Sequence, residues 1–266
     1  MPAPTPTEEL RRRAAETRWY HSMDIGHGIR SVGVNEPEPL VPRLHLPDLH
    51  GKTVLDVGSW DGFFAFEAER RGAAKVAVLD HYMWAIDIPA QQRYWADCLA
   101  KGVAPEPYHE TDLWHPDTLP GKAGFDTARE ILSSDVEEVV ADFATCDLQQ
   151  VGTWDVTLFL GVLYHMPDPL GALRRLATMT NELAIIETEA VVVPGYEHEA
   201  MWRFFPKAEL NGDVSNWWAP NIAALVGALE PAGFARAEVK LGPAKELLEQ
   251  PGGPHHFRAI VHARKS

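Results

Sequence analysis

The chain has 266 residues, of which 24 are Lys or Arg and 38 are Asp or Glu, so its formal net charge is −14. This acidic balance argues against a basic nucleic-acid clamp, and a composition of 45% hydrophobic and 23% charged residues excludes disorder over the whole length. We expect a soluble cytoplasmic protein, because no stretch approaches the ~20 apolar residues of a membrane span and no basic-then-apolar signal opens the chain. Two cysteines, Cys98 and Cys146, are too few for a disulfide framework or a cysteine-based zinc site.

Residues 1–50 are predicted to form a helix and an active-site loop ahead of the main domain. Thr7 to Thr17 is expected to be a helix, because glutamates begin it and arginines follow, which suits the helix dipole. Residues 19–29 have neither the period of a strand nor that of a helix, which indicates an ordered loop. Such a loop either folds over a ligand and excludes water, or packs against the edge of a sheet.

From residue 53, apolar strands alternate with helical patterns, which is typical of a parallel sheet built from right-handed βαβ units. The predicted strands are Thr53–Val57, Lys75–Leu79, Val136–Val140, Asp155–Leu160, Leu183–Thr188, Phe234–Lys240 and His256–Ala263. The predicted helices are Gly62–Arg71, Pro89–Ala100, Ala123–Ser133, Pro169–Met179 and Pro220–Glu230. The main domain therefore covers residues 51–266, with insertions at about 81–122 and 190–219 that are expected to cover a site.

The most informative motif follows the first predicted strand. It reads Asp56-Val57-Gly58-Ser59-Trp60-Asp61-Gly62, and Asp80 lies 22 residues after Gly58. Glycines at a strand-to-helix turn let the backbone approach a ligand, and a carboxylate at the tip of the second strand can accept both hydroxyl hydrogens of a ribose. The motif favours a nucleoside-type ligand over ordinary turn glycines. Its D-x-G-x-x-x-G spacing disfavours an NAD-dependent dehydrogenase, which requires G-x-G-x-x-G.

Two further strand ends carry polar or aromatic residues. Asp142-Phe143 follows the third strand, where a carboxylate and an aromatic ring can meet the amino group and face of an adenine. Residues 161–165 (Gly-Val-Leu-Tyr-His) follow the fourth strand. Open α/β sheets bind their ligands at the carboxyl ends of their strands, so we expect these groups to converge on one crevice.

These motifs resemble those of the seven-stranded, Rossmann-like S-adenosylmethionine-dependent methyltransferases, over roughly residues 50–263. In that fold the last strand pair is antiparallel. Residues 161–170 (GVLYHMPDPL), residues 121–125 (GKAGF) and Trp19-Tyr20-His21 are similar to motifs of the tRNA wobble-uridine carboxymethyl (methoxyuridine) transferases and their relatives. Those tRNA-modifying enzymes carry an Arg/Lys-rich surface and extra basic residues for a special cofactor, and we identify no such set in this acidic chain.

The resemblance implies S-adenosyl-L-methionine as cofactor and assigns its contacts by position. The implied cofactor-binding residues are Asp56, Gly58, Ser59, Trp60, Gly62, Asp80, His81, Asp142, Phe143, Gly161 and Tyr20. In this assignment the two glycines shape the loop around the methionine and ribose, Asp80 binds the ribose hydroxyls, and Asp142 and Phe143 flank the adenine.

Four side chains are candidates for the chemistry: His165, Tyr164, Glu187 and His21. A base is needed only where the nucleophile is a protonated hydroxyl or amine, and the ordinary histidine pKa of about 6.5 suits His165 to that task. The equal alternative for His165 is a structural hydrogen bond. Glu187 and Glu189 alternate along the fifth strand, so both carboxylates are expected to face one side. Either they bind a substrate amine or hydroxyl, or one is solvated and the other is structural.

Aromatic residues gather in the second insertion: Trp202, Phe204, Phe205, Trp217 and Trp218. They suit an apolar, flat or cationic substrate, or they pack the insertion against itself. No metal site is expected, because the 12 histidines are scattered and form no H-x-x-x-H or HExxH motif.

The sequence therefore predicts methyl transfer from S-adenosylmethionine to an oxygen or nitrogen of a small molecule, such as a secondary metabolite or sugar. One alternative keeps the cofactor but transfers a carboxymethyl or aminocarboxypropyl group, or cyclises the cofactor itself. A second alternative is modification of a tRNA wobble uridine, and a third is a binding protein without activity. Nucleic-acid and membrane partners are not expected, and a homodimer is a further possibility.

Overall fold

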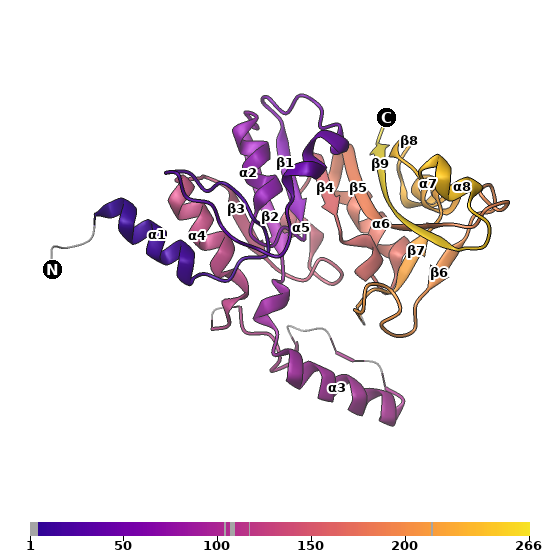
Figure 1. The fold of residues 1–266 in the computed structure, drawn as a ribbon, viewed down its shortest axis with the longest axis horizontal. Coiled ribbons are helices and arrows are strands. Elements are labelled where there is room, and N and C mark those ends of the chain that lie inside the picture. Colours follow the sequence, from indigo (N-terminus) through magenta and orange to yellow (C-terminus); the bar gives the residue numbers. More distant parts are fainter. Residues whose placement is uncertain (1–4, 104, 107–109, 117, 214) are drawn as a thin grey trace. The chain divides into compact units, whose positions relative to one another are not determined.

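The computed structural model describes residues 5–103, 105–106, 110–116, 118–213 and 215–266. Seven strands form one sheet in the order β3-β2-β1-β4-β5-β9-β8. They are β1 (Thr53–Val57), β2 (Lys75–Asp80), β3 (Glu137–Val140), β4 (Trp154–Leu160), β5 (Thr180–Val192), β8 (Arg236–Leu241) and β9 (His255–Arg264). A separate two-stranded sheet pairs β6 (Trp202–Phe204) with β7 (Trp218–Pro220). Figure 1 labels these elements.

The part of the chain that the structure describes also contains α-helices. They are α1 (Pro6–Glu16), α2 (Phe63–Arg70), α3 (Ile88–Lys101), α4 (Ala123–Leu132), α5 (Leu148–Val151), α6 (Pro169–Met179), α7 (Ile222–Ala232) and α8 (Lys245–Glu249). No helix among the described residues is long and apolar enough to cross a bilayer.

The chain divides into two compact units. The first unit comprises Met1–Pro39, Gly58–Arg71 and Lys75–Cys146, and the second comprises Leu40–Val57, Gly72–Ala74 and Asp147–Ser266. β2 and β3 belong to the first unit, and the other five strands of the sheet belong to the second.

In the first unit, β2 and β3 are parallel, with Asp80 opposite Val140. α1 begins with a capping box, in which the Thr5 side chain accepts from the Glu8 amide and the Glu8 side chain accepts from the Thr5 amide. α1 lies beside α4, and Arg13 pairs with Glu130 across them (Figure 1). The N-terminal extension is thus anchored to a helix that follows the first insertion.

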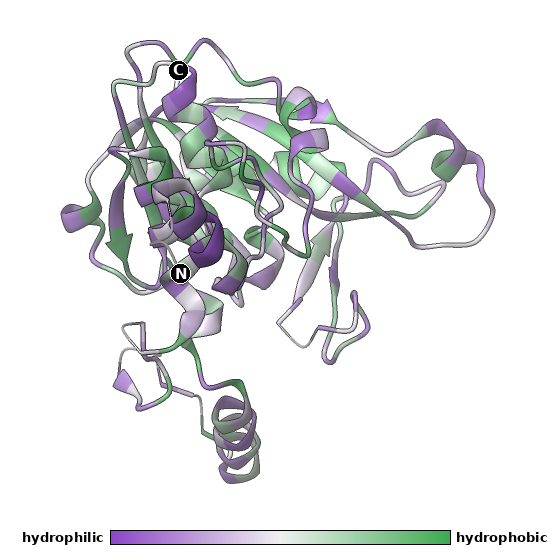
Figure 2. Ribbon diagram, turned by 60° about the vertical axis from the view of Figure 1, so that its left-hand side comes forward, coloured by the Kyte–Doolittle hydropathy of each residue, from purple (hydrophilic) through white to green (hydrophobic). Residues whose placement is uncertain are grey.

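In the second unit, β1, β4 and β5 are parallel, whereas β9 runs antiparallel to both β5 and β8. α6 and α7 pack against each other and against β5. β1, β4 and β5 are rich in apolar residues, which favours their burial: Val54, Leu158 and Ile185 are each at most 1% exposed. Figure 2 shows the strands coloured largely hydrophobic. The antiparallel last pair agrees with the fold that the sequence resembles.

The predicted elements are confirmed in order and type, with one correction at Pro220. We expected Pro220 to open a helix, but it ends β7, and α7 begins only after Asn221, whose side chain accepts from the Ala224 amide at 2.9 Å. An asparagine side chain at the N-cap accepts from a free N–H of the first helical turn, and a proline side chain has no acceptor atom for that N–H. β5 also extends beyond its predicted bounds, and the short elements β6, β7, α5 and α8 were not predicted.

Candidate active site

The glycine turn of the first unit has an unusual backbone. Gly58, Trp60 and Gly62 all have positive φ angles, of 74°, 51° and 82°. A Cβ atom on Gly62 would lie 2.7 Å from the Phe125 ring and 2.9 Å from the Phe66 ring, so only glycine fits there without displacing them. The Gly58 amide donates to the Leu79 carbonyl at 2.8 Å, which holds the turn at the end of β2.

The side chain of Asp80 holds the same turn through hydrogen bonds. Its Oδ2 accepts from the Trp60 amide at 2.8 Å, and its Oδ1 accepts from the Tyr82 amide at 2.6 Å. Burial raises the pKa of Asp80 despite these hydrogen bonds. The carboxylate also accepts from the His81 amide, so three of the four lone pairs of its oxygens are used and one acceptor position remains. Asp80 therefore both shapes the turn and retains the capacity to accept from one ribose hydroxyl.

Asp61 ties the N-terminal loop to the turn. Its Oδ2 accepts from the amides of Tyr20 at 2.6 Å and His21 at 2.8 Å. Burial raises the pKa of Asp61 to about 6, although the two amide hydrogen bonds oppose the shift. We call residues 18–24 the N-terminal strap. The expected ordered loop is thus observed, and a carboxylate of the glycine motif anchors it.

Three aromatic rings join the strap to the turn and to the first insertion. The Tyr20 and Trp60 rings are stacked, with centroids 4.3 Å apart and planes 17° apart. Trp84 presents its edge to Trp60 at 4.7 Å, and the Arg18 guanidinium lies 3.9 Å from the Trp84 ring centroid. Stacking and cation–π contacts of this kind add to apolar burial. Trp60 is therefore held in place from two sides.

His21 packs in the interior of the first unit. Its side chain is 4% exposed and lies beside the rings of Phe63 and Phe64. Burial lowers the pKa of His21 to about 4, so the imidazole is neutral at physiological pH. This environment supports a packing role for His21, which we had named as a candidate for the chemistry.

The remaining predicted residues of the first unit lie at the ends of β2 and β3. The His81 carbonyl accepts from Trp114 Nε1 at 2.6 Å, which attaches the first insertion to the end of β2. The Ala141 amide donates to the Asp80 carbonyl at 3.0 Å, so Asp142 follows directly beside β2. Phe143 is only 4% exposed. These contacts bring Asp80, His81 and Asp142 together at one sheet edge.

In the second unit, Asp56 and Gly161 mark neighbouring parallel strands. Asp56 is buried in β1, opposite Leu158 of β4. Gly161 follows β4 with a φ of 74°, and its amide donates to the Glu187 carbonyl of β5 at 2.9 Å. A Cβ on Gly161 would lie 3.5 Å from the Tyr164 hydroxyl. The turn after β4 thus places Tyr164 against β5.

Glu187 and Glu189 face one side of β5, as their alternation predicts, and both pair with Arg258 of β9. The Arg258 guanidinium binds Glu187 through Nε and Nη2, and Glu189 through Nη1 at 3.0 Å. Burial alone lowers the pKa of Arg258, but hydrogen bonding and attraction to Glu187 outweigh it and raise that pKa. Neither carboxylate is solvated, which corrects one of our two expectations. Two buried carboxylates on one guanidinium leave a net charge of −1.

His165 lies in the η5 turn (Leu163–His165) and contacts the second insertion. Its Nδ1 is 3.0 Å from Ser215 Oγ and 3.1 Å from the Ser215 carbonyl. Ser215 Oγ donates to Asp213 at 2.7 Å. The His165 and Tyr164 ring centroids are 4.2 Å apart, and Arg258 lies 5.0 Å from the Tyr164 ring. A continuous polar cluster therefore runs from Asp213 to Glu189.

The aromatic residues of the second insertion serve two roles. Phe205 is 1% exposed and packs with Val191, Leu210 and Ala219. Phe204, by contrast, is 48% exposed, with its ring 4.8 Å from Trp218. The insertion thus packs on itself and also presents an aromatic surface.

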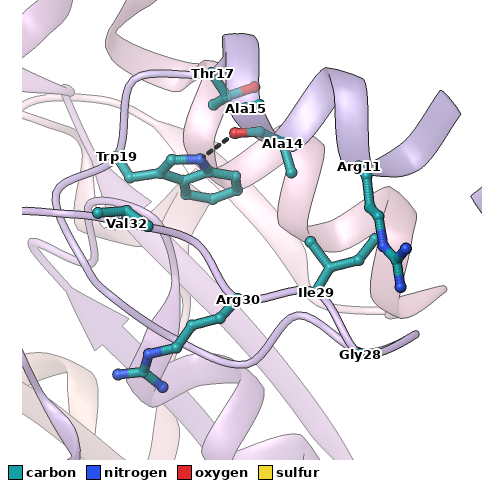
Figure 3. Close-up of a pocket in the computed structure, with 9 residues that line it drawn as sticks. All are labelled: Arg11, Ala14, Ala15, Thr17, Trp19, Gly28, Ile29, Arg30 and Val32. Atoms are coloured by element: carbon teal, nitrogen blue, oxygen red, sulfur yellow. Dashed lines mark hydrogen bonds between the residues drawn. The ribbon is translucent and has the colours of Figure 1, made fainter. Parts of the chain in front are cut away.

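A cavity of about 480 Å³ lies elsewhere in the first unit, between α1 and the loop of residues 28–32 (Figure 3). Its lining residues are Arg11, Ala14, Ala15, Thr17, Trp19, Gly28, Ile29, Arg30 and Val32. None of them is a predicted site residue. Within the described parts of the chain, no group of three or more His, Cys, Asp or Glu side chains is arranged to hold a metal ion.

A family model described as a methyltransferase domain matches residues 32–238. The chain belongs to the methyltransferase-domain family. The matched range includes the glycine turn, the Asp80 strand end, the turn after β4 and both insertions. The family that the motifs resemble is therefore confirmed.

Among curated relatives, this methyltransferase domain is similar to tRNA U34 carboxymethyltransferases. That of Mannheimia succiniciproducens is 23% identical over 207 residues, which are 77% of this chain and 52% of the relative. That of Pseudomonas savastanoi pv. phaseolicola is 27% identical over 188 residues, which are 70% of this chain and 46% of the relative. The chain spans about half the length of these relatives.

Among solved structures, the domain is similar to the N-terminal domain of EvdMO1, crystallised in the presence of SAH and D-fucose. The TM-score is 0.62 at 19% identity, over 98% of this chain and 97% of that one. This similarity confirms the predicted Rossmann-like α/β fold with a mostly parallel seven-stranded sheet.

Several residues that complete these clusters were not singled out from the sequence: Arg18, Asp61, Trp84, Asp213, Ser215 and Arg258. Asp61 lies inside the glycine motif, and this position is a usable signal. Arg18, Trp84, Ser215 and Arg258 contact partners tens of residues away, and Asp213 reaches His165 only through Ser215, so no local pattern marks these contacts.

Proposed function

We propose that this methyltransferase domain binds S-adenosylmethionine and transfers its methyl group to an oxygen or nitrogen of a small molecule. The observation that carries the proposal is the glycine turn fastened by Asp80, in a chain of the methyltransferase-domain family. The residues fit the group. Asp80 retains one acceptor position for a ribose hydroxyl, and Ser59 Oγ and Asp61 Oδ1 are buried without a hydrogen-bond partner in the described chain.

The bound cofactor would supply an electrophilic methyl carbon whose leaving sulfur departs neutral, so the protein mainly has to align the nucleophile. In the first unit, Asp80 holds the ribose, Asp142 lies beside it for the adenine, and Trp60 and the strap exclude water. In the second unit, Glu189 and Arg258 offer hydrogen-bond acceptors and donors to a polar substrate. A hydroxylated acceptor such as a sugar is consistent with the D-fucose present with the EvdMO1 domain.

Calorimetric titration with S-adenosylmethionine and S-adenosylhomocysteine, with NAD as the control, tests the cofactor. We expect micromolar binding of both sulfur nucleosides and none of NAD. Mass analysis of the incubated nucleoside then separates the alternatives. Methyl transfer yields S-adenosylhomocysteine, whereas attack on the aminocarboxypropyl chain yields methylthioadenosine. If neither sulfur nucleoside binds, the proposal fails and the glycine turn is structural.

A second candidate function is modification of the tRNA wobble uridine. The similarity to tRNA U34 carboxymethyltransferases favours it. The net charge of −14 opposes it, and so does the pairing of many basic side chains, such as Arg12 with Glu9 and Glu16, and Arg30 with Glu36 and Glu38. We rank it below a small-molecule acceptor.

A further inference from the structure

His165 is bound by a chain of hydrogen bonds that ends on a carboxylate. Its Nδ1 lies 3.1 Å from the Ser215 carbonyl oxygen and 3.0 Å from Ser215 Oγ. Asp213 Oδ1 accepts from Ser215 Oγ at 2.7 Å and from the Ser215 amide at 2.8 Å. The three residues lie in the second unit, and Asp213 and Ser215 belong to the second insertion.

The chemistry of these partners determines where the imidazole proton lies. A carbonyl oxygen can only accept, so Nδ1 must donate to it. The Ser215 hydroxyl hydrogen points to the Asp213 carboxylate, and Ser215 Oγ is therefore also an acceptor toward Nδ1. Both contacts require a proton on Nδ1, so the lone pair of the neutral ring is on Nε2.

Additional contacts fix the insertion around His165. The Trp217 amide donates to the Tyr164 carbonyl at 2.8 Å, and Trp218 Nε1 donates to the Pro167 carbonyl at 3.2 Å. The chain on both sides of His165 is thus hydrogen-bonded to the segment that carries Ser215. His165 follows the carboxyl end of β4, the edge at which open α/β sheets bind ligands.

We propose that Asp213 and Ser215 are positioning residues that hold His165 with its proton on Nδ1, so that Nε2 serves as the base for the acceptor nucleophile. This inference rests on the proposed function. In the step, the nucleophile forms a bond to the methyl carbon while the carbon–sulfur bond breaks with its electron pair on sulfur. The nucleophile's proton passes to Nε2, and the resulting imidazolium is stabilised through Ser215 by the Asp213 carboxylate.

Other charged groups lie on the elements packed against η5. They are Glu187 and Glu189 of β5, with Arg258 of β9 between them, and Asp168, Arg174 and Arg175 at the start and on the body of α6. The two β5 carboxylates are already paired with Arg258, which faces the ring of Tyr164. Asp213 differs from these groups because hydrogen bonds join it to the imidazole through a single serine.

The first test measures the tautomer without any ligand. Long-range ¹H–¹⁵N correlation spectra of the full chain identify the ring nitrogens of His165, assigned by the signals lost in His165→Asn. We expect the Nδ1–H pattern in the unmodified protein. In Asp213→Asn we expect the His165 titration to move to lower pH by roughly 0.5–1 unit, because a nearby negative charge is removed. Glu199→Gln removes an exposed charge from the same insertion and should leave the titration unchanged.

The second test measures catalysis as S-adenosylhomocysteine formation with a panel of hydroxyl and amine acceptors. We expect His165→Asn to lower kcat at least about 100-fold, and Asp213→Asn and Ser215→Ala to lower kcat with little change in the KM for S-adenosylmethionine. The acid limb of the pH–rate profile should move to lower pH in Asp213→Asn, and Asp213→Glu should restore it. A purely structural loop contact would not move that limb.

The two proposals fail in different ways. An Nε2–H pattern in the unmodified protein overturns the positioning role whatever happens to the variants. Product formation that is insensitive to His165→Asn overturns it as well. Absence of S-adenosylmethionine binding in calorimetry overturns the proposed function itself, and that result is available before any variant is made.

Discussion

Gly62 couples the shape of the glycine turn to the packing of α2. A methyl group there would meet the Phe125 and Phe66 rings at 2.7 and 2.9 Å, at a φ of 82°. Gly62→Ala combines a strained left-handed backbone, about 1 kcal/mol, with overpacking of about 1–3 kcal/mol. We therefore expect the free energy of unfolding to fall by about 2–4 kcal/mol, measured by urea denaturation. Gly102→Ala is the control, because its φ is 67° but its Cβ meets nothing within 4 Å. Equal losses in the two variants would contradict the packing argument.

Asp80 is the residue on which the cofactor proposal depends most directly. Asp80→Ala removes the acceptor for the ribose hydroxyls and also frees the Trp60 and Tyr82 amides. We expect the affinity for S-adenosylmethionine to fall by about 1–3 kcal/mol, the range for lost charge-assisted hydrogen bonds. Calorimetry measures this loss, circular dichroism checks that the variant folds, and the exposed Asp135→Ala serves as the control. An unchanged affinity in a folded Asp80→Ala would remove Asp80 from the site.

At the scale of elements, the N-terminal strap and the glycine turn that anchors it each contain a buried group, His21 and Asp61, and the two have opposite pH dependence. The pKa of Asp61 rises from 3.8 to about 6, so the folded protein keeps a proton that the unfolded chain loses, and stability falls as pH rises from about 4 to 6. The pKa of His21 falls from 6.5 to about 4, so the unfolded chain binds a proton that the folded protein does not. Stability from His21 therefore rises over nearly the same interval.

This opposition predicts opposite slopes in two single variants. Relative to the unmodified protein, Asp61→Asn should gain stability as pH rises from 4 to 6, whereas His21→Gln should lose stability over the same interval. Each difference should amount to about 2–3 kcal/mol, since one pKa unit corresponds to about 1.4 kcal/mol. Urea denaturation at half-unit pH steps measures both slopes. If the two slopes have the same sign, the burial assigned to one of these side chains is wrong.

The sequence predicts helices and strands better than it predicts contacts between residues far apart in the chain, and the site shows why. β1 was predicted at its observed bounds, because an apolar run between charged residues and a glycine is a local signal. The alternation of Glu187 and Glu189 likewise predicted their shared face. Arg258, however, is 69 residues from Glu189 in the chain, and its role follows only from the antiparallel register of β5 with β9.

The same reasoning applies to the second insertion. β6 and β7 have three residues each, too few for a period to appear in the sequence. Proline is common at the first position of a helix, and for that reason Pro220 was assigned to a helix instead of to β7. Asp213 and Ser215 lie about 50 residues from His165, in a segment predicted only as a cover. Their contacts arise from tertiary folding of that segment, which no propensity describes. The assigned roles of the individual site residues therefore stay predictions that the variants above test.

At the scale of the whole molecule, charge separates the two classes of acceptor. Binding to tRNA neutralises phosphates with Lys and Arg, so a genuine tRNA enzyme loses affinity steeply with salt. With a net charge of −14, this chain is expected to repel the RNA. Some of its basic side chains are also paired with carboxylates, as Lys122 is with Asp126 and Glu138. We expect no retarded band in a tRNA gel shift at 50 mM salt, with a basic tRNA-binding protein as the positive control.

The opposite result would be equally informative. A tRNA complex that forms at 50 mM salt and dissociates by 200 mM would show that a local basic face outweighs the net charge. The substrate class would then be RNA, and the aromatic surface around Phe204 and Trp218 would be the place to look for stacked bases. Substituting Phe204 by alanine should in that case weaken the complex by about 1–3 kcal/mol while leaving the salt dependence unchanged, because stacking carries no counterion release.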